Sequence, residues 1–360
     1  MRDYTKEQLC ILWLKSGDLL GWNAVDVLIE KYGSAESVWR TFSADMMDEL
    51  GKAYDHLKKQ RDKGLDALLI RLEELNARAI FREDDDYPEN LILIANAPRI
   101  LYVRGTLPEG PSVSIVGSRR DTRYGKSSAF RIAKELAENG VTVISGMARG
   151  IDTAAHEGAI AGKGKTVAVL GCGIDVCYPP ENKILMENIL ISGGAVVTEL
   201  PPGTQPLSFH FPLRNRIISG LSDALLLIEA RLKSGTNSTV NYALEQGKEV
   251  FALPGNVDAP GSELPLKLLK EGALICTEGN DILEYMNWSR IGDKEIRQMN
   301  VFEDTEDPVL RALLREEKTF EELIEETGFN ASELGIKLTM LEFEGSIERR
   351  AGRAYAIKRN

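Results

Sequence analysis

The chain has 360 residues, of which 43% are hydrophobic and 28% are charged, and its formal net charge is −11. This composition is typical of a globular protein with two or three domains. The sequence contains no signal peptide and no run of the roughly 20 apolar residues that cross a bilayer, so we expect a cytoplasmic protein without a membrane partner. Its four cysteines lack CxxC spacing and neighbouring histidines, which argues against a disulfide framework and against a metal site.

The charge is unevenly distributed along the chain. Residues 111–220 contain 12 Lys and Arg against 9 Asp and Glu, whereas residues 301–360 contain 9 against 14. The negative net charge argues against a nucleic-acid partner, because such partners usually require a basic domain. Counted locally, however, the middle of the chain keeps the positive charge that an anion site needs.

The N-terminal part of the chain is predicted to be helical. Apolar residues recur at spacings of three and four, and each segment ends near glycine, serine or asparagine. This pattern predicts a small domain of short helices over residues 1–78. The stretch that follows, FREDDDYPENL (residues 81–91), carries an acidic run and a proline and is typical of a linker or turn.

From Ser112 onward, short β-branched runs alternate with amphipathic helical segments. The alternation predicts an α/β fold over residues 79–287, with a doubly wound parallel sheet covered by helices on both faces. Ligands of such sheets bind at the carboxyl ends of the strands. The loops of interest therefore follow Val116, Ile144, Leu170, Leu200, Ile228 and Leu253.

The C-terminal part is predicted to be a separate small domain. An acidic linker over residues 288–307 precedes three helical segments and two short strands, and this order is typical of a winged helix over residues 308–360. The basic residues of this domain gather in RRAGRAYAIKR (residues 349–359). The sequence leaves open whether the winged helix contacts DNA or a protein.

The stretch SGMARGIDTAAHEGA (residues 145–159) is the first candidate site. Gly146 and Gly150 let the backbone approach a ligand, and Arg149 adds charge beside a predicted helix N-terminus, a combination that favours phosphate. Asp152 and His156 lie four residues apart and could form an acid/base pair. Alternatively, Asp152 holds the turn or Arg149 and His156 is a structural neighbour, because no nucleophile completes a catalytic set.

A second candidate loop, IVGSRRDTRYGKSS, follows the strand that ends at Val116. It contains Gly117, Ser118, Arg119 and Arg120. It contains neither GxGxxG nor GxxxxGK[ST], which are the usual motifs for NAD binding and for ATP hydrolysis, so the sequence gives no evidence for either. Anion binding is one interpretation of its arginines, and a structural role is the other.

The segment FPLRNRIISGLS places Arg214, Asn215 and Arg216 between apolar residues. Arginines so close to a core must be ion-paired or line a cleft, because burying them alone is costly. Taken with the two other arginine-bearing loops at the same sheet edge, they favour a cleft.

Two further groups of donors precede helices. Lys233, Ser234, Gly235 and Thr236 form a turn in which N-capping explains Ser234 and Thr236 but not Lys233. Lys183 begins another helical segment, where it is either a phosphate contact or a solvated lysine.

In this order and spacing, IVGSRR, SGMARGIDTAAHEGAI, GCGIDVCYPPENK, FPLRNRIISGLS, KSG and VFALPGNV resemble the DNA-processing protein A (DprA/Smf) family over about residues 87–282. The N-terminal helices resemble the family's sterile-alpha-motif-like domain, and the C-terminal segment resembles its winged helix. The chain departs from the family pattern in TNSTVN (residues 236–241) and ELPL (residues 263–266).

The resemblance implies an extended Rossmann-like core that binds single-stranded DNA, with no cofactor and no established catalytic activity. It also implies a homodimer formed through this core, which protects incoming single strands and loads the RecA recombinase during natural transformation and recombination. The DNA-contacting residues that it implies are Gly117, Ser118, Arg119, Arg120, Gly146, Met147, Arg149, Gly150, Arg214, Asn215, Arg216, Lys233, Ser234, Gly235 and Thr236. We expect salt-sensitive, sequence-tolerant binding, with Tyr124, Tyr178, Phe209 and Phe211 as candidate stacking partners.

An enzyme of the same Rossmann class, a nucleotide phosphoribohydrolase, is the alternative. Such enzymes use a glutamate in a PGGxGTxxE loop. The corresponding turn here, KSGTNSTVNYALE, lacks the double glycine and contains no glutamate before Glu245.

Overall fold

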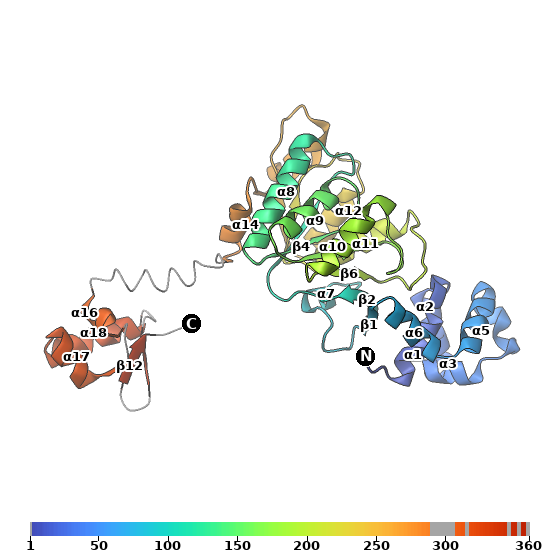
Figure 1. Ribbon diagram of the computed structural model, residues 1–360, viewed down its shortest axis with the longest axis horizontal. Helices are drawn as coiled ribbons and strands as arrows, with labels where there is room; N and C mark the ends of the chain where they lie inside the picture. The colour runs from blue at the N-terminus through green and yellow to red at the C-terminus, as the bar shows by residue number, and fades with distance from the viewer. Residues whose placement is uncertain (1, 289–306, 314–316, 344–346, 351–353, 358–360) are drawn as a thin grey trace. The chain divides into compact units, whose positions relative to one another are not determined.

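The structure is a computed structural model that describes residues 2–288, 307–313, 317–343, 347–350 and 354–357. It divides into two compact units, Met1–Trp288 and Ser289–Asn360 (Figure 1). The N-terminal helices and the sheet belong to one unit. The boundary that we predict between them at residue 78 therefore stays a prediction. Most of the predicted acidic linker, residues 289–306, lies outside the described residues.

The N-terminal residues form the expected short helices. These are α1 (Lys6–Leu14), α2 (Trp22–Tyr32), α3 (Ala35–Thr41), α4 (Met47–Leu50), α5 (Tyr54–Lys63) and α6 (Asp66–Glu74), with 3₁₀ turns at Ser16–Asp18, Ala44–Met46 and Gly51–Ala53. Helix α1 begins with a capping box between Thr5 and Gln8. The fully buried Trp13 donates from its indole Nε1 to the carbonyl of Leu57 at 2.9 Å, which joins α1 to α5.

The central sheet has nine strands among the described residues. They are β1 (Ala77–Phe81), β2 (Ile100–Gly105), β3 (Ser112–Val116), β4 (Thr142–Ser145), β5 (Thr166–Val169), β6 (Ala195–Thr198), β7 (Ala224–Leu227), β8 (Glu249–Ala252) and β9 (Leu274–Ile275), in the spatial order β1-β2-β6-β5-β4-β3-β7-β8-β9. The pairs from β6 to β9 are parallel, which confirms the predicted doubly wound sheet.

Strands β1 and β2 extend this sheet and are not predicted from the sequence. Strand β2 pairs antiparallel with both β6 and β1. The acidic stretch interpreted as a linker or turn therefore connects two strands of one sheet. It includes the short helix α7 (Glu89–Ile92), and its Tyr87 and Leu91 are buried in the core.

Helices cover both faces of the sheet. They are α8 (Arg123–Glu138), α9 (Ile151–Ala161), α10 (Lys183–Ile191), α11 (His210–Gly220), α12 (Thr236–Glu245), α13 (Glu263–Lys270) and α14 (Gly279–Tyr285). One core cluster packs α11, α12 and α13 on the sheet through residues such as Ile217, Val240 and Leu264. A second cluster packs α8, α9 and α14 on the other face through residues such as Ile132, Ala154 and Ile282.

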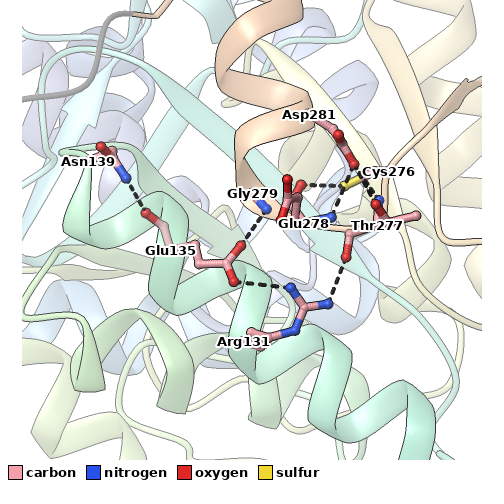
Figure 2. Close-up of polar contacts among 8 residues, drawn as sticks. All are labelled: Arg131, Glu135, Asn139, Cys276, Thr277, Glu278, Gly279 and Asp281. Carbon is pink, nitrogen blue, oxygen red and sulfur yellow. Dashed lines mark hydrogen bonds and ion pairs between the residues drawn. The ribbon is translucent and has the colours of Figure 1, made fainter. Parts of the chain in front are cut away.

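Helix α14 is fastened to α8 by polar contacts (Figure 2). Glu135 accepts from the backbone N–H of Gly279 at 2.6 Å, and Arg131 donates to the carbonyl of Thr277 at 2.7 Å. Asp281 accepts from the backbone N–H groups of Thr277 and Glu278, which satisfies donors at the start of the helix. These contacts fix the C-terminal end of the first unit.

The second unit is the predicted winged helix. It contains α16 (Pro308–Leu313), β10 (Lys318–Thr319), α17 (Phe320–Thr327), α18 (Ala331–Phe343), β11 (Ile347–Arg349) and β12 (Ala354–Ile357), with strand order β10-β12-β11. Val309, Leu323 and Leu338 are buried in its core. In the predicted basic segment, residues 351–353, 358 and 359 lie outside the described residues. Across the described parts of both units, no helix combines the length and the apolar character that a membrane span requires.

Candidate functional site

The predicted arginine-bearing segments meet at the carboxyl edge of the sheet. Arg119 follows β3, Arg149 follows β4, and Arg214 lies on α11. Together with Gly146, Ala148, Tyr178, Pro179 and Phe211, these three arginines line one shallow pocket of about 20 Å³. The arrangement agrees with the expectation that strand-end loops form a common site.

The loop of residues 146–150 needs glycine at two positions. A Cβ atom on Gly146 would lie 2.6 Å from the guanidinium of Arg214 and 2.8 Å from the carboxylate of Asp152. Gly150 has a φ of +80°, and a Cβ there would meet the carbonyl oxygen of Ser118. The loop of residues 146–150 thus lies directly against the loop of residues 117–120, and the backbone N–H of Ile151 donates to the carbonyl of Ser118 at 3.2 Å.

Met147, in the same loop, is fully buried, so its side chain packs into the protein and not toward a ligand. Its carbonyl oxygen accepts from the side chain of Asn182 at 3.0 Å. The loop of residues 146–150 is therefore held in place by the buried side chain of Met147 and by the hydrogen bond from Asn182.

Arg214 is a buried member of the site, only 4% exposed. Its guanidinium donates to the carbonyl of Gly146 at 2.8 Å and to that of Val169. Burial lowers the pKa of Arg214 to about 10, and the nearby carboxylate of Asp152 opposes this shift. Burial raises the pKa of Asp152, which Arg214 opposes in turn. The two charges thus compensate each other beneath the pocket.

His156 does not form the exposed acid/base group that the sequence left open. The ring is fully buried, and burial lowers its pKa to about 3, so it is neutral near pH 7. The hydroxyl of Thr166 donates to the carbonyl of Val143 and therefore accepts from Nδ1 of His156 at 2.6 Å. A neutral, solvent-excluded ring favours the interpretation that His156 has a structural role.

Arg119 and Arg149 are the exposed arginines of the pocket. The guanidinium of Arg119 lies 5.2 Å from the ring centroid of Phe211, and Phe211 in turn contacts Tyr178 with a centroid distance of 5.5 Å. Arg149 forms an ion pair with Glu181, which raises the pKa of Arg149. Positive charge and aromatic surface therefore lie side by side at the edge of the pocket.

The neighbouring Arg120 is also exposed, and its backbone N–H donates to the hydroxyl of Ser118 at 3.0 Å. This contact shapes the turn of residues 117–120 and leaves the side chain of Arg120 on the surface. Gly117 is buried, and a Cβ atom there would meet Ile151 at 2.7 Å.

Arg214, Asn215 and Arg216 lie on helix α11 and not in the loop that we predicted, because this polar triplet sits within an otherwise apolar helical segment. Arg216 forms two bonds of 2.6 Å with Glu199 and a third with the carbonyl of Asn96. Asn215 is buried and donates to the hydroxyl of Ser238 at 2.8 Å. Ion pairing therefore accounts for Arg216, whereas Arg214 reaches the pocket.

The turn before α12 corrects the N-capping explanation. The N-cap residue is Gly235, which has no capping side chain. Thr236 instead donates to the carbonyl of Gly117 at 3.0 Å, and Ser234 has a buried hydroxyl without a hydrogen-bond partner among the described residues. Thr236 thus fastens this turn to the turn of residues 117–120. Lys233 is exposed.

Lys183 is exposed on the first turn of α10 and does not line the pocket. Glu245 is the last residue of α12 and is exposed.

Two glutamates that contact the loops around the pocket were not recognised in the sequence. Glu229 follows β7, is 6% exposed, and accepts from the backbone N–H and the hydroxyl of Thr122. Its signal in the sequence is a carboxylate directly after the apolar run of residues 224–228. Glu181, the partner of Arg149, lies 32 residues along the chain from it and carries no such signal.

A larger cavity in the described part of the chain lies elsewhere. It has a volume of about 520 Å³ between the N-terminal helices and the loop after β6, with Leu12, His56, Arg71 and Tyr102 in its lining. None of the predicted site residues lines it. The described residues contain no cluster of His, Cys, Asp and Glu that could hold a metal ion.

Residues 78–287 match the family model of DNA recombination-mediator protein A, and residues 302–353 match that of the DprA winged helix domain. The chain is 42% identical to protein Smf of Escherichia coli over 228 residues, which are 63% of this chain and 61% of that protein. It is 44% identical to DNA processing protein DprA of Streptococcus pneumoniae over 202 residues, 56% of this chain and 71% of that protein.

Two solved structures have a similar fold. The X-ray structure of DNA processing protein A from Streptococcus pneumoniae has a TM-score of 0.60 and 34% identity, and the match covers 79% of this chain and 98% of that one. A structure of DNA processing protein A from Helicobacter pylori, reported for its single-stranded DNA binding mode, has a TM-score of 0.52 and 28% identity over 58% of this chain and 95% of that one.

Proposed function

Because the chain belongs to the DNA recombination-mediator protein A family, we propose that it binds single-stranded DNA and acts in DNA processing. The observation that carries this proposal is the pocket in which Arg119, Arg149 and Arg214 converge at the carboxyl edge of the sheet. A guanidinium presents N–H donors in a geometry that matches phosphate. The pocket is therefore suited to the phosphates of a nucleic-acid backbone.

The glycines of the site support phosphate binding. Gly146 and Gly150 let the loop after β4 pack closely against Arg214, Asp152 and Ser118, which places the N-terminus of α9 beside the arginines, and the helix dipole there attracts an anion. These contacts read no bases, so we expect binding without sequence preference.

The aromatic side chains favour single strands over duplex. Phe211 and Tyr178 line the pocket beside the arginines, and unpaired bases can stack on such rings while the phosphates contact the guanidinium groups. In a duplex the bases are already stacked and paired. We therefore propose that the rings distinguish the two forms.

The predicted site residues take three roles in this proposal. The exposed cations Arg119, Arg120, Arg149, Lys183 and Lys233 contact phosphate. Arg214, Asn215, Arg216 and Thr236 position the loops, and Arg214 also forms the floor of the pocket. Gly117, Ser118, Gly146, Met147, Gly150, Ser234 and Gly235 contribute through their backbone.

Family membership also supports the finer parts of the proposal. We propose that the protein is a homodimer formed through its Rossmann-like unit, protects incoming single strands, and loads the RecA recombinase onto them during natural transformation. Analytical ultracentrifugation tests the dimer, and the rate of RecA filament formation on protein-coated single strands tests the loading.

The alternative function, phosphoribohydrolase activity, requires a glutamate in a PGGxGTxxE loop, which corresponds here to the turn of residues 233–236 that leads into α12. Glu245, the first glutamate after this turn, lies at the far end of α12. We therefore propose that the protein binds nucleic acid and does not release a base from a nucleotide. Detection of free base after incubation with nucleoside monophosphates would reverse this choice.

The experiment for the main proposal is fluorescence anisotropy with a labelled oligonucleotide. Arg119→Ala and Arg149→Ala should weaken binding by about 10- to 150-fold each, since a hydrogen bond to a charged group contributes about 1.5–3 kcal/mol. Lys165→Ala is the control, because it removes one positive charge from the opposite edge of the sheet, just before β5. Equal binding by all three variants would refute the proposed site.

A further inference from the structure

Four of the arginines around the site are held in different ways. Arg119 contacts the ring of Phe211, Arg214 is buried against backbone carbonyls, and Arg216 is clamped by Glu199. Among these four arginines, only Arg149 combines an exposed guanidinium with a carboxylate partner, Glu181. This pair raises the question of what an acidic side chain does in a site for phosphate.

The backbone next to Glu181 is firmly placed. Glu181 lies in the 3₁₀ turn Pro180–Asn182, which follows Tyr178 and Pro179 of the pocket. The buried Asn182 donates to the carbonyl of Met147 at 3.0 Å and to the hydroxyl of Thr153 at 2.9 Å. These bonds join the turn to the loop of residues 146–150 and so place Glu181 beside Arg149.

The pair itself is open to solvent and weak. The side chain of Arg149 is 57% exposed and that of Glu181 is 52% exposed. Arg216 and Glu199, by contrast, are 14% and 22% exposed and share two bonds of 2.6 Å. Exposed ion pairs contribute little and break easily, whereas a half-buried bidentate pair is a lasting structural link.

We propose that Glu181 competes with DNA for Arg149. In the free protein its carboxylate occupies the guanidinium, and a backbone phosphate displaces it when a strand enters the pocket. Glu181 thus sets the affinity of the site and favours a polyanion over isolated anions, because only a strand brings further contacts at Arg119 and the aromatic rings to offset the lost ion pair. This inference rests on the proposed binding of single-stranded DNA.

The competition predicts a gain of affinity when the carboxylate is removed. Glu181→Gln keeps the size of the side chain but frees Arg149, and we expect about two- to five-fold tighter binding of single-stranded DNA, in line with the small contribution of an exposed pair. If Glu181 instead oriented Arg149 for contact with DNA, removal of its carboxylate would weaken binding. The sign of the change therefore separates the two roles.

The test is an anisotropy titration of a fluorescent oligothymidine with five proteins: the natural chain, Glu181→Gln, Glu157→Gln, Arg149→Ala, and the double variant Arg149→Ala with Glu181→Gln. Glu157, an exposed residue of α9, is the control for the loss of one negative charge. We expect tighter binding for Glu181→Gln only, and no gain from it in the Arg149→Ala background. Unchanged or weaker binding by Glu181→Gln, or an equal gain from Glu157→Gln, would overturn the competition while leaving the proposed function intact. Absence of binding by the natural chain would overturn both.

Discussion

The replacement Arg214→Ala probes the buried charges beneath the site. It removes the guanidinium that bonds the carbonyls of Gly146 and Val169 and leaves the carboxylate of Asp152 buried without its neighbouring cation. Breaking a buried pair from one side costs about 3–5 kcal/mol, because the remaining charge is uncompensated. We therefore expect Arg214→Ala to lower the free energy of unfolding by that amount at pH 7.

The loss should depend on pH in a defined direction. Burial raises the pKa of Asp152 in the folded protein, and without Arg214 it rises further. A carboxyl group whose pKa is raised on folding destabilises the folded protein only when it is ionised. This loss of stability is absent below the ordinary pKa of about 4 and develops as pH increases through the pKa of the group in the folded protein. Relative to the natural chain, Arg214→Ala should thus be most destabilised near neutral pH and least so near pH 4.

Urea unfolding followed by circular dichroism measures this effect. The double variant Asp152→Asn with Arg214→Met removes both charges and should recover much of the lost stability, since the uncompensated carboxylate is gone. If Arg214→Ala unfolds at the same urea concentration as the natural chain at pH 7, or if the double variant is no more stable than the single one, the reasoning about this buried pair is refuted.

Three further predictions follow from the site. Gly150→Ala should be more destabilising than Gly193→Ala in thermal unfolding, because both have positive φ but only Gly150 lies against a neighbouring backbone, that of Ser118; equal losses would show that the contact is unimportant. Phe211→Ala should weaken binding of single-stranded DNA by about 1–3 kcal/mol in anisotropy titrations, while Phe130→Ala, an exposed ring of α8, should not; an unchanged affinity of Phe211→Ala would exclude base stacking there. Deletion of residues 308–360 should leave affinity within about two-fold, because the positive charge of the site belongs to the first unit; a larger loss would make the winged helix a main DNA contact.

The layout of the sheet could be predicted where the strands are continuous apolar runs. Strands β3 to β8 are of this kind, and their amphipathic helices have clear ends. Strands β1 and β2 carry Arg78 and Arg104 within short runs, and they are held by antiparallel pairing with distant partners. Local patterns do not encode such pairing.

The candidate site was predictable in its location but not in its detail. Strand-end loops in a doubly wound fold must gather at one edge, so the convergence of Arg119, Arg149 and Arg214 follows from topology. The burial of Arg214 and the pairing of Arg149 with Glu181 depend on contacts between residues far apart in the chain. The types of residue could be read from the sequence, whereas their division into exposed and buried groups depends on the folded structure.

The most direct test of the proposed function is a titration of labelled single-stranded and double-stranded oligonucleotides with the natural chain over a range of salt concentrations. We predict preferential binding of the single strand, with a logarithm of affinity that falls linearly with the logarithm of salt by about 0.7 for each phosphate contacted. Arg119→Ala and Arg149→Ala should each reduce this slope by about one contact. Failure of the natural chain to bind the single strand at low salt, or slopes that these two replacements leave unchanged, would contradict the account.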